Sequence, residues 1–248
     1  MRATRMPRKY MDVRVSPMDL FDAERPALSW TPVYKDLRDA IVGHRIPPGM
    51  KLPEDEVASI YGISRTIVRA ALQALSHDRL VNLEPNRGAF VAQPSKREAR
   101  EVFEARALVE PHVAALACDN SNPEQIARLR DHLEREHEAI HAGRDSDAIM
   151  LSARFHMGIA EMADHSILTD VVKDLIHRSS LIIALYWRRR DTTCERHAHL
   201  ALVNAIERRS KPDASELMKS HIIDLLSGLD LSQTADPGGR TLSAILKG

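Results

Sequence analysis

Apolar residues recur with a helical period over most of the chain. From residue 95 onward they return every three or four positions, with breaks at Pro123, Gly143 and Pro212. We expect helices over residues 97–118, 123–142, 145–163, 166–190, 195–209 and 211–228. Because successive amphipathic helices with short loops pack antiparallel, residues 99–230 are predicted to form an all-α bundle.

The first third of the chain combines helical periods with two short apolar runs. Helices are expected over residues 33–44, 54–60 and 65–78. The runs at 80–83 and 89–91 flank the turn sequence PNRG, which is typical of a β-hairpin. With a tight turn at Gly62, this order predicts a winged helix-turn-helix domain over residues 28–93 and a linker at 94–98. The predicted fold class is therefore mostly α, with a small β-hairpin wing.

The expected helix after Ser64 carries polar residues suited to DNA. The Ser64 hydroxyl can cap the free N–H groups of the first turn, and such a helix end suits a phosphate or a base edge. Arg87 would stand at the tip of the wing, within reach of a minor groove. The candidate DNA contacts are Ser64, Arg65, Thr66, Arg69, Arg87 and Gly88. Taken alone, most arginines at the spacing of Arg65 and Arg69 are ordinary solvated helix charges, so the DNA interpretation depends on the whole pattern.

The whole pattern resembles the DNA-binding domain of the GntR family of bacterial transcription regulators. The matching residues are PG at 48–49, Leu52, GISRT at 62–66, Val68, Arg69, Ala71, Leu72, Leu75 and GAFV at 88–91. The resemblance implies a winged helix-turn-helix that binds double-stranded operator DNA. The sequence departs from the family pattern at Ile67, Ala70 and Asp55. Several subfamilies carry a DNA-contacting arginine at the position of Asp55, so one contact of the family is in question.

The charge distribution has the sign that DNA binding requires. The chain has 35 basic and 35 acidic residues, but residues 1–95 carry a net charge of +3 and residues 96–248 a net charge of −3. This bias is mild, so non-specific DNA affinity should be modest and sensitive to salt.

Cysteine usage and hydropathy indicate the compartment. Cys118 and Cys194 form no CxxC pair, and the longest apolar run, at 181–187, is far shorter than the ~20 residues of a membrane span. We expect a cytoplasmic protein with no membrane partner. Residues 1–27, basic and aperiodic, are expected to form a flexible arm, and residues 231–248 a tail.

Three histidines, His156, His199 and His221, each fall on the apolar face of an expected helix. Burying three imidazoles in one bundle requires a partner for each of them. A shared divalent metal would satisfy all three, with zinc the first choice and nickel or manganese as alternatives. For any one such histidine a hydrogen-bonded core position is the better interpretation, so the metal hypothesis depends on the three together.

The helical region resembles the FCD type of ligand-binding domain found in one GntR subfamily. The matching motifs are RALVE at 106–110, FH at 155–156, His199 ahead of AI at 205–206, and MKSH at 218–221. The resemblance implies a bundle that holds a metal and a small organic acid. Ser152 stands where the family has an acidic metal ligand, and serine is a far poorer ligand. Three histidines still suffice for zinc, with water or an effector carboxylate in the fourth position.

Arg106 is an unusual charge in an apolar stripe. In the resembling family an arginine here faces the effector, and a guanidinium pairs well with a carboxylate. The resemblance thus assigns Arg106 and Ser152 to the effector site. The alternative is a structural ion pair, for which Glu110, one helical turn on, is the candidate partner.

Residues and resemblance together predict a sequence-specific transcription regulator, a repressor, whose operator binding is controlled by a small carboxylate and a metal. One recognition helix reads few base pairs, so we expect a homodimer on a palindromic operator. A metal-responsive regulator without an organic effector is one alternative. The other is a hydrolase in which the metal activates water, but the sequence places no general base for it, and we expect no enzyme.

Overall fold

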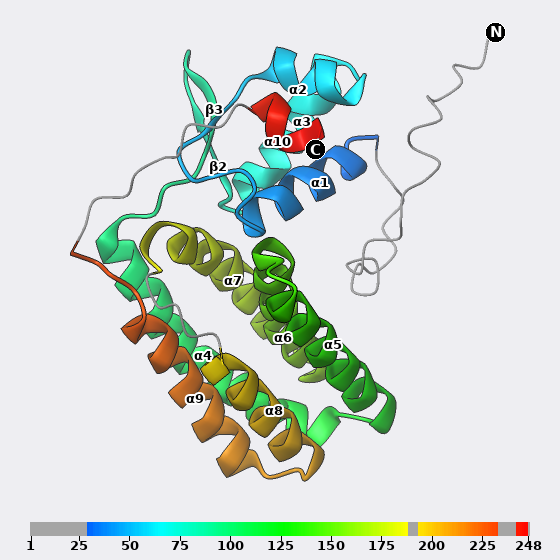
Figure 1. Ribbon diagram of the computed structural model, residues 1–248, viewed down its shortest axis with the longest axis vertical. Helices are drawn as coiled ribbons and strands as arrows, with labels where there is room; N and C mark the ends of the chain where they lie inside the picture. Colours follow the sequence, from blue (N-terminus) through cyan, green and yellow to red (C-terminus); the bar gives the residue numbers. More distant parts are fainter. Residues whose placement is uncertain (1–28, 188–192, 233–241, 248) are drawn as a thin grey trace, which may run out of the picture.

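The computed structural model describes residues 29–187, 193–232 and 242–247. Figure 1 shows a small head of short helices and strands stacked on a bundle of long helices. The arm expected at 1–27 lies outside the described residues. Within the described ranges, none of the helices combines the length and apolar character that crossing a bilayer requires.

The head is a winged helix-turn-helix. Its elements are α1 (Thr31–Val42), β1 (Lys51–Leu52), α2 (Glu54–Tyr61), α3 (Arg65–His77), β2 (Val81–Glu84) and β3 (Gly88–Val91). Strand β3 lies between β1 and β2 and is antiparallel to both. Gly62 ends α2 in the left-handed conformation, and the Ser64 hydroxyl accepts the N–H of Ile67 to open α3. Val57 and Leu72 bury the apolar faces of the two helices against each other and α1.

The bundle holds a second, larger core. Its helices are α4 (Lys96–Asn120), α5 (Pro123–His141), α6 (Asp145–Met162), α7 (Ser166–Tyr186), α8 (Thr193–Glu207) and α9 (Lys211–Ser227). Helix α4 packs along α9, α7 and α6, while α5 packs on α6 and α8. Asn122 opens α5 in a reciprocal capping box with Gln125, as short loops between helices often require. Phe103 and Phe155 are fully buried at the centre.

The predicted fold class is confirmed, and the expected helices lie within a few residues of the observed ones. The predicted end of one helix was wrong: the helix expected over residues 166–190 is α7, which stops at Tyr186. Residues 188–192 lie outside the described ranges. Two elements were not expected. Strand β1 has two residues, too few for any periodicity, and helix α10 (Leu242–Lys247) lies within the expected tail.

The expected linker is tied down rather than free. Helix α4 begins at Lys96, whose ammonium donates to the carbonyl of Ser232 at 3.0 Å. The hydroxyl of Tyr186, at the end of α7, donates to the carbonyl of Pro94 at 2.9 Å. The Ser95 hydroxyl caps the first turn of α4. The chain between head and bundle therefore has fixed contacts on both sides.

The head contacts the bundle through the end of α1. The Ser180 hydroxyl of α7 donates to the carbonyl of Val42 at 2.8 Å. At Gly43 a Cβ would lie 3.1 Å from the Met150 side chain of α6, so the approach of α1 to the bundle favours glycine. Helix α10 also returns to the head, where Leu242 is buried in the head core beside α2 (Figure 1).

Candidate nucleic-acid interface and metal centre

The first turns of α3 present their polar residues to solvent, as predicted. Ser64 is the cap, and Arg65, Thr66 and Arg69 are exposed, while Val68 on the opposite face is fully buried. A solvent-facing helix N-terminus with two arginines one turn apart has the shape and charge that a major groove accepts.

Both arginines are held by carboxylates at the start of α2. Arg69 donates from Nε and NH2 to the two Glu54 oxygens at 3.0 and 2.7 Å, a bidentate pair. Arg65 lies 3.2 Å from Asp55 and 3.4 Å from Glu54. Hydrogen bonding from Arg69 lowers the pKa of Glu54. We call Glu54 and Asp55 the acidic clamp. Glu54 was missed by the sequence analysis because its arginine partners lie on another helix.

The wing places Arg87 at its tip, as predicted. The Arg87 side chain is 70% exposed, pairs with Glu84 and stacks over the Phe90 ring at 5.3 Å. Gly88 begins β3 with a positive φ of 99°, which favours glycine at this position. The hairpin therefore carries a cation at the position from which a wing reaches DNA.

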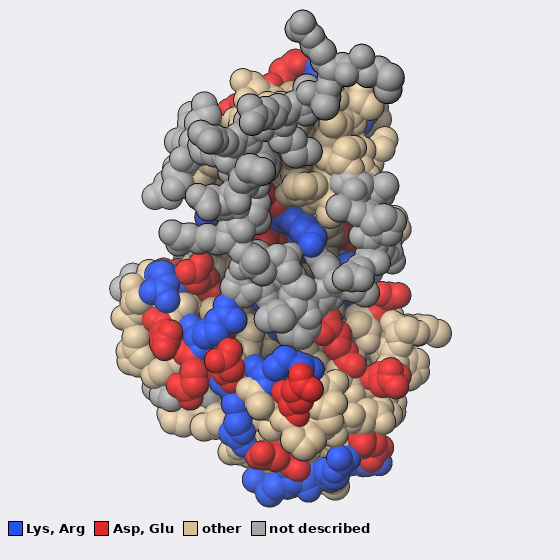
Figure 2. Space-filling model, turned by 90° about the vertical axis from the view of Figure 1, so that its right-hand side faces the viewer, with Lys and Arg blue, Asp and Glu red and all other residues tan. Residues whose placement is uncertain are grey.

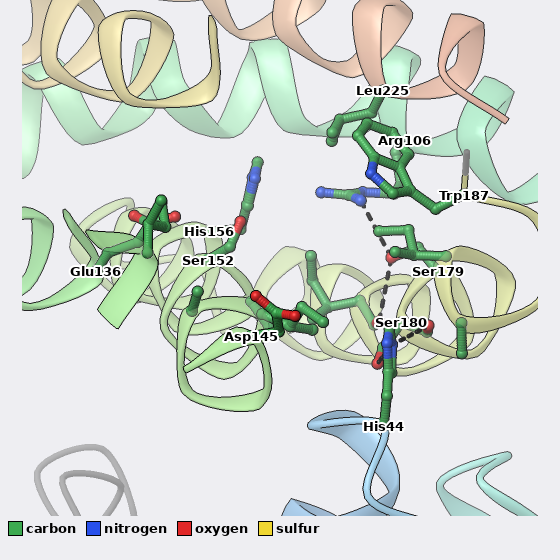
Figure 3. Close-up of a pocket in the computed structure, with 17 residues that line it drawn as sticks. His44, Arg106, Glu136, Asp145, Ser152, His156, Ser179, Ser180, Trp187 and Leu225 are labelled. Atoms are coloured by element: carbon green, nitrogen blue, oxygen red, sulfur yellow. Dashed lines mark hydrogen bonds between the residues drawn. The ribbon is translucent and has the colours of Figure 1, made fainter. Parts of the chain in front are cut away.

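The structure brings the three predicted histidines together inside the bundle. His156 comes from α6, His199 from α8 and His221 from α9, and all three are buried. The Nε2 atom of His221 lies 3.1 Å from that of His199 and 3.3 Å from that of His156. Figure 3 shows His156 beside the cavity described below. We call these three residues the histidine triad.

Two buried carboxylates hold the outer nitrogens of the triad. His156 Nδ1 lies 2.6 Å from Glu110, and His199 Nδ1 lies 3.2 Å from Glu136. Such a carboxylate fixes the tautomer in which Nδ1 carries the proton and Nε2 offers its lone pair. Burial lowers the pKa of His156 despite the adjacent Glu110. Burial opposes ionisation of Glu110 too, but Arg106 and His156 lower its pKa to about 2.

The triad fits a divalent cation. For a tetrahedral zinc with Zn–N bonds of ~2.05 Å, neighbouring nitrogens are ~3.3 Å apart. The observed 3.1 and 3.3 Å agree with that separation, and the three ligand nitrogens all lie within 4.8 Å of one another. Burial, with the neighbouring imidazoles second, lowers the pKa of His221 well below its ordinary value, so the neutral ligand form dominates at pH 7.

A cavity of about 520 Å³ opens beside the triad. Its walls include His156, Ser152, Arg106 and Glu136, which Figure 3 shows around one space. Arg106, fully buried, donates to Glu110 at 2.5 Å and to Ser179 at 3.1 Å, the latter also in the wall. The predicted ion pair of Arg106 with Glu110 is therefore confirmed, and because Arg106 also lines the cavity, its effector role stays a prediction.

Sequence reasoning missed Glu136 and Ser179. Glu136 stands in the run EREHE, whose charges suggest a solvated face, yet its side chain is buried. Its spacing of four residues from His132, also buried, was the available signal.

On the face of the bundle shown in Figure 2, basic and acidic side chains are interspersed, so that face offers no single-sign field for DNA.

Family comparisons assign both halves of the chain. Residues 31–91 match the family of bacterial regulatory proteins named gntR, and residues 101–224 match the FCD domain. The first match covers α1 to β3 and the second covers most of α4 to α9.

The relatives are transcription regulators rather than enzymes. The regulator YdhC of Bacillus subtilis is 24% identical over 208 residues, which cover 82% of this chain and 92% of YdhC. The Nta operon regulator of Aminobacter aminovorans is 26% identical, covering 73% of this chain and 85% of that protein. In solved structures, McbR/YncC of E. coli shares the fold with a TM-score of 0.70 at 24% identity, covering 81% of this chain and 99% of that one.

Proposed function

The chain belongs to the GntR family of bacterial transcription regulators and carries an FCD domain, and we propose that it is a repressor released from its operator by a small carboxylate bound beside a metal. The observation that carries the proposal is the histidine triad, whose ligand nitrogens lie within 4.8 Å of one another, beside a cavity whose wall includes His156. The head supplies DNA binding and the bundle supplies control. The hydrolase alternative is dropped because the relatives are regulators.

DNA contacts are proposed for the exposed start of α3 and the wing. Arg65 and Arg69 suit base edges or phosphates, Ser64 and Thr66 offer hydroxyls, and Arg87 with Gly88 suits a minor groove. The position of these six residues supports the proposal, because all of them are exposed on the head.

A homodimer on a palindromic operator is proposed because one head reads too few base pairs. Its support is that helices α4 and α7, which pack on each other, both expose large apolar side chains: Leu108 is 79% exposed, Ile167 69% and Val171 39%. Exposed apolar side chains of this kind suit the self-complementary contact of a two-fold dimer.

Beside the cavity, the histidine triad would hold the metal, with zinc proposed first. When bound, the metal offers a Lewis-acid position to the carboxylate of the effector. Glu110 and Glu136 keep the triad in its ligand tautomer. Arg106 orients a second oxygen of the acid, and Ser152 supplies a hydroxyl in place of an anionic ligand. With a serine in place of the acidic ligand of the family, the site carries one negative charge fewer, which favours an anionic effector.

The proposal is tested first on DNA. Random duplexes selected by chelator-treated protein should converge on a palindrome. Arg65→Ala and Arg69→Ala should each weaken binding to it at least tenfold, whereas Arg128→Ala, an exposed and paired arginine of α5, should not. Unchanged sequence-specific binding in both head variants would contradict the proposal.

Release is tested on the selected duplex with zinc and small carboxylates together, monitored by fluorescence anisotropy. The second candidate, a metal-responsive regulator, is favoured by one observation: Arg106 is already neutralised by Glu110. Release by zinc alone would favour that candidate, and release only by zinc with an acid favours the first.

A further inference from the structure

The cavity beside the histidine triad reaches the DNA-binding head. Among its lining residues in the described part of the chain, only His44 belongs to the head. In Figure 3, His44 rises from the segment after α1 toward Ser180, opposite the wall that holds Arg106. A ligand in this space therefore lies between the two domains rather than inside one of them.

His44 is fixed by the bundle. Its Nε2 donates to the carbonyl of Ser180 at 2.8 Å, while the Ser180 hydroxyl donates back to Val42 at 2.8 Å. The residue has a positive φ of 58°, the left-handed conformation of a tight turn. The preceding Gly43 approaches α6 so closely that a Cβ would lie 3.3 Å from the carbonyl oxygen of Ser146. The turn at 42–44 thus fits between α6 and α7.

The same turn is connected to both functional sites. On one side, Ser180 follows Ser179, which accepts a hydrogen bond from Arg106 at 3.1 Å. On the other side, the turn ends α1, which packs directly on the recognition helix α3. A displacement at the cavity wall therefore has a short, packed route to the DNA-reading helix.

We propose that His44 completes the ligand site from the side of the head, so that the bound acid contacts both domains and holds the head in its docked position. This inference rests on the proposed function, because it concerns the ligand of the same cavity. A ligand that gains contacts only in the docked arrangement must stabilise that arrangement, and docking must raise its affinity by the same factor.

The hydrogen bonding of His44 also limits the chemistry of the ligand. A carbonyl can only accept, so His44 Nε2 carries the proton and Nδ1 is left as an acceptor. Burial lowers the pKa of His44, which keeps this neutral form at pH 7. Asp145, in the same wall, is a second acceptor. The far end of the acid must therefore bring a donor, and the ligand class is a hydroxycarboxylate.

The test uses full-length zinc-loaded protein and a matched pair of probes, malate and succinate, which differ by one hydroxyl. Binding is measured by calorimetry and head docking by amide hydrogen exchange of residues 31–46. In the wild type, malate should bind more tightly than succinate and slow this exchange. In His44→Ala, malate should bind about tenfold more weakly, the preference over succinate should vanish, and the exchange should no longer slow.

The controls separate this inference from the proposed function. His112→Ala, which removes an exposed histidine of α4, should behave as the wild type. His44→Asn, whose residue type tolerates a left-handed backbone, replaces His44→Ala if that variant does not fold. Equal malate affinity and equal slowing in wild type and variant would overturn the inference alone. If neither acid binds the wild type, the hydroxycarboxylate assignment fails, and the role of His44 fails with it.

Discussion

At the scale of single residues, the arginines of the recognition helix form ion pairs within the protein in the absence of DNA. Glu54 holds Arg69 through two hydrogen bonds, and Asp55 lies 3.2 Å from Arg65. Both arginines are exposed, so solvent screens the pairs and DNA phosphates can compete for the guanidiniums. The acidic clamp therefore aligns the arginines while limiting their attraction to DNA of any sequence.

Replacing one residue of the acidic clamp should change the affinity for DNA of any sequence more than it changes sequence specificity. Asp55→Arg removes a negative charge and adds a cation near the phosphates, so binding to random duplex DNA should strengthen. The slope of log affinity against log salt should steepen by about 0.9 for one new phosphate contact. Glu104→Arg, the same charge change on exposed α4, is the control. An unchanged slope in Asp55→Arg would show that position 55 does not face DNA.

Outside the triad, the carboxylate of Glu136, which is hydrogen-bonded to His199, should contribute most to metal affinity. Glu136→Gln removes the charge that fixes the imidazole tautomer, so zinc affinity should fall by about 10- to 100-fold. Competition with a chromophoric chelator measures the loss. Glu134→Gln, on the exposed side of the same helix, should leave zinc affinity unchanged. Equal affinities for the two variants would remove Glu136 from the site.

The histidines and arginines were predictable as residues, and so was Glu110 as the partner of Arg106 on the same helix, but partners on other helices were not. His156, His199 and His221 could be found because an imidazole on an apolar helix face breaks a local pattern. Glu54 and Glu136 break no such pattern, since each stands among other charges. Only the packing of helices brings them to their partners, and the apolar periodicity of one helix does not predict which residues of another helix it contacts.

At the scale of elements, the long helices were predictable, whereas strand β1 and helix α10 were not. Helices α4 to α9 each present several repeats of an apolar face, which fixes their type and approximate ends. Helix α10 has six residues, and its Leu242, Ile245 and Leu246 share one face. A single turn and a half of helix is stable only where it packs, so its structure depends on the head.

Helix α10 should therefore stabilise the head. Leu242 is 4% exposed in the head core, so Leu242→Asp would bury a carboxylate without a partner and should undock the helix. Amide exchange of α2 should quicken, and exchange in the bundle should not. Ile223→Asp, at a half-exposed position of α9, is the control. Unchanged exchange in α2 would mean that α10 contributes nothing to the head.

At the scale of the whole molecule, head and bundle meet around two histidines, His177 and His44. His177 of α7 is buried where it faces Asp78 at the end of α3, with Arg38 of α1 and Lys173 of α7 nearby. Burial, opposed mainly by Asp78, lowers the pKa of His177 to about 4. Burial lowers the pKa of His44 at the same junction. Both imidazoles are therefore neutral while the head is docked.

This junction should weaken in acid. Below pH 6.5 the unfolded chain takes up protons that the folded state refuses, so the contribution of His177 to stability is present above pH 6.5 and is lost as pH falls toward 4. Urea unfolding of chelator-treated protein should show a lower free energy of unfolding at pH 5 than at pH 7. In His177→Gln, which cannot titrate, the decrease should be smaller by about 2 kcal/mol. An equal decrease in variant and wild type would place the acid sensitivity in other groups, such as the histidine triad, and would leave the junction without a role in it.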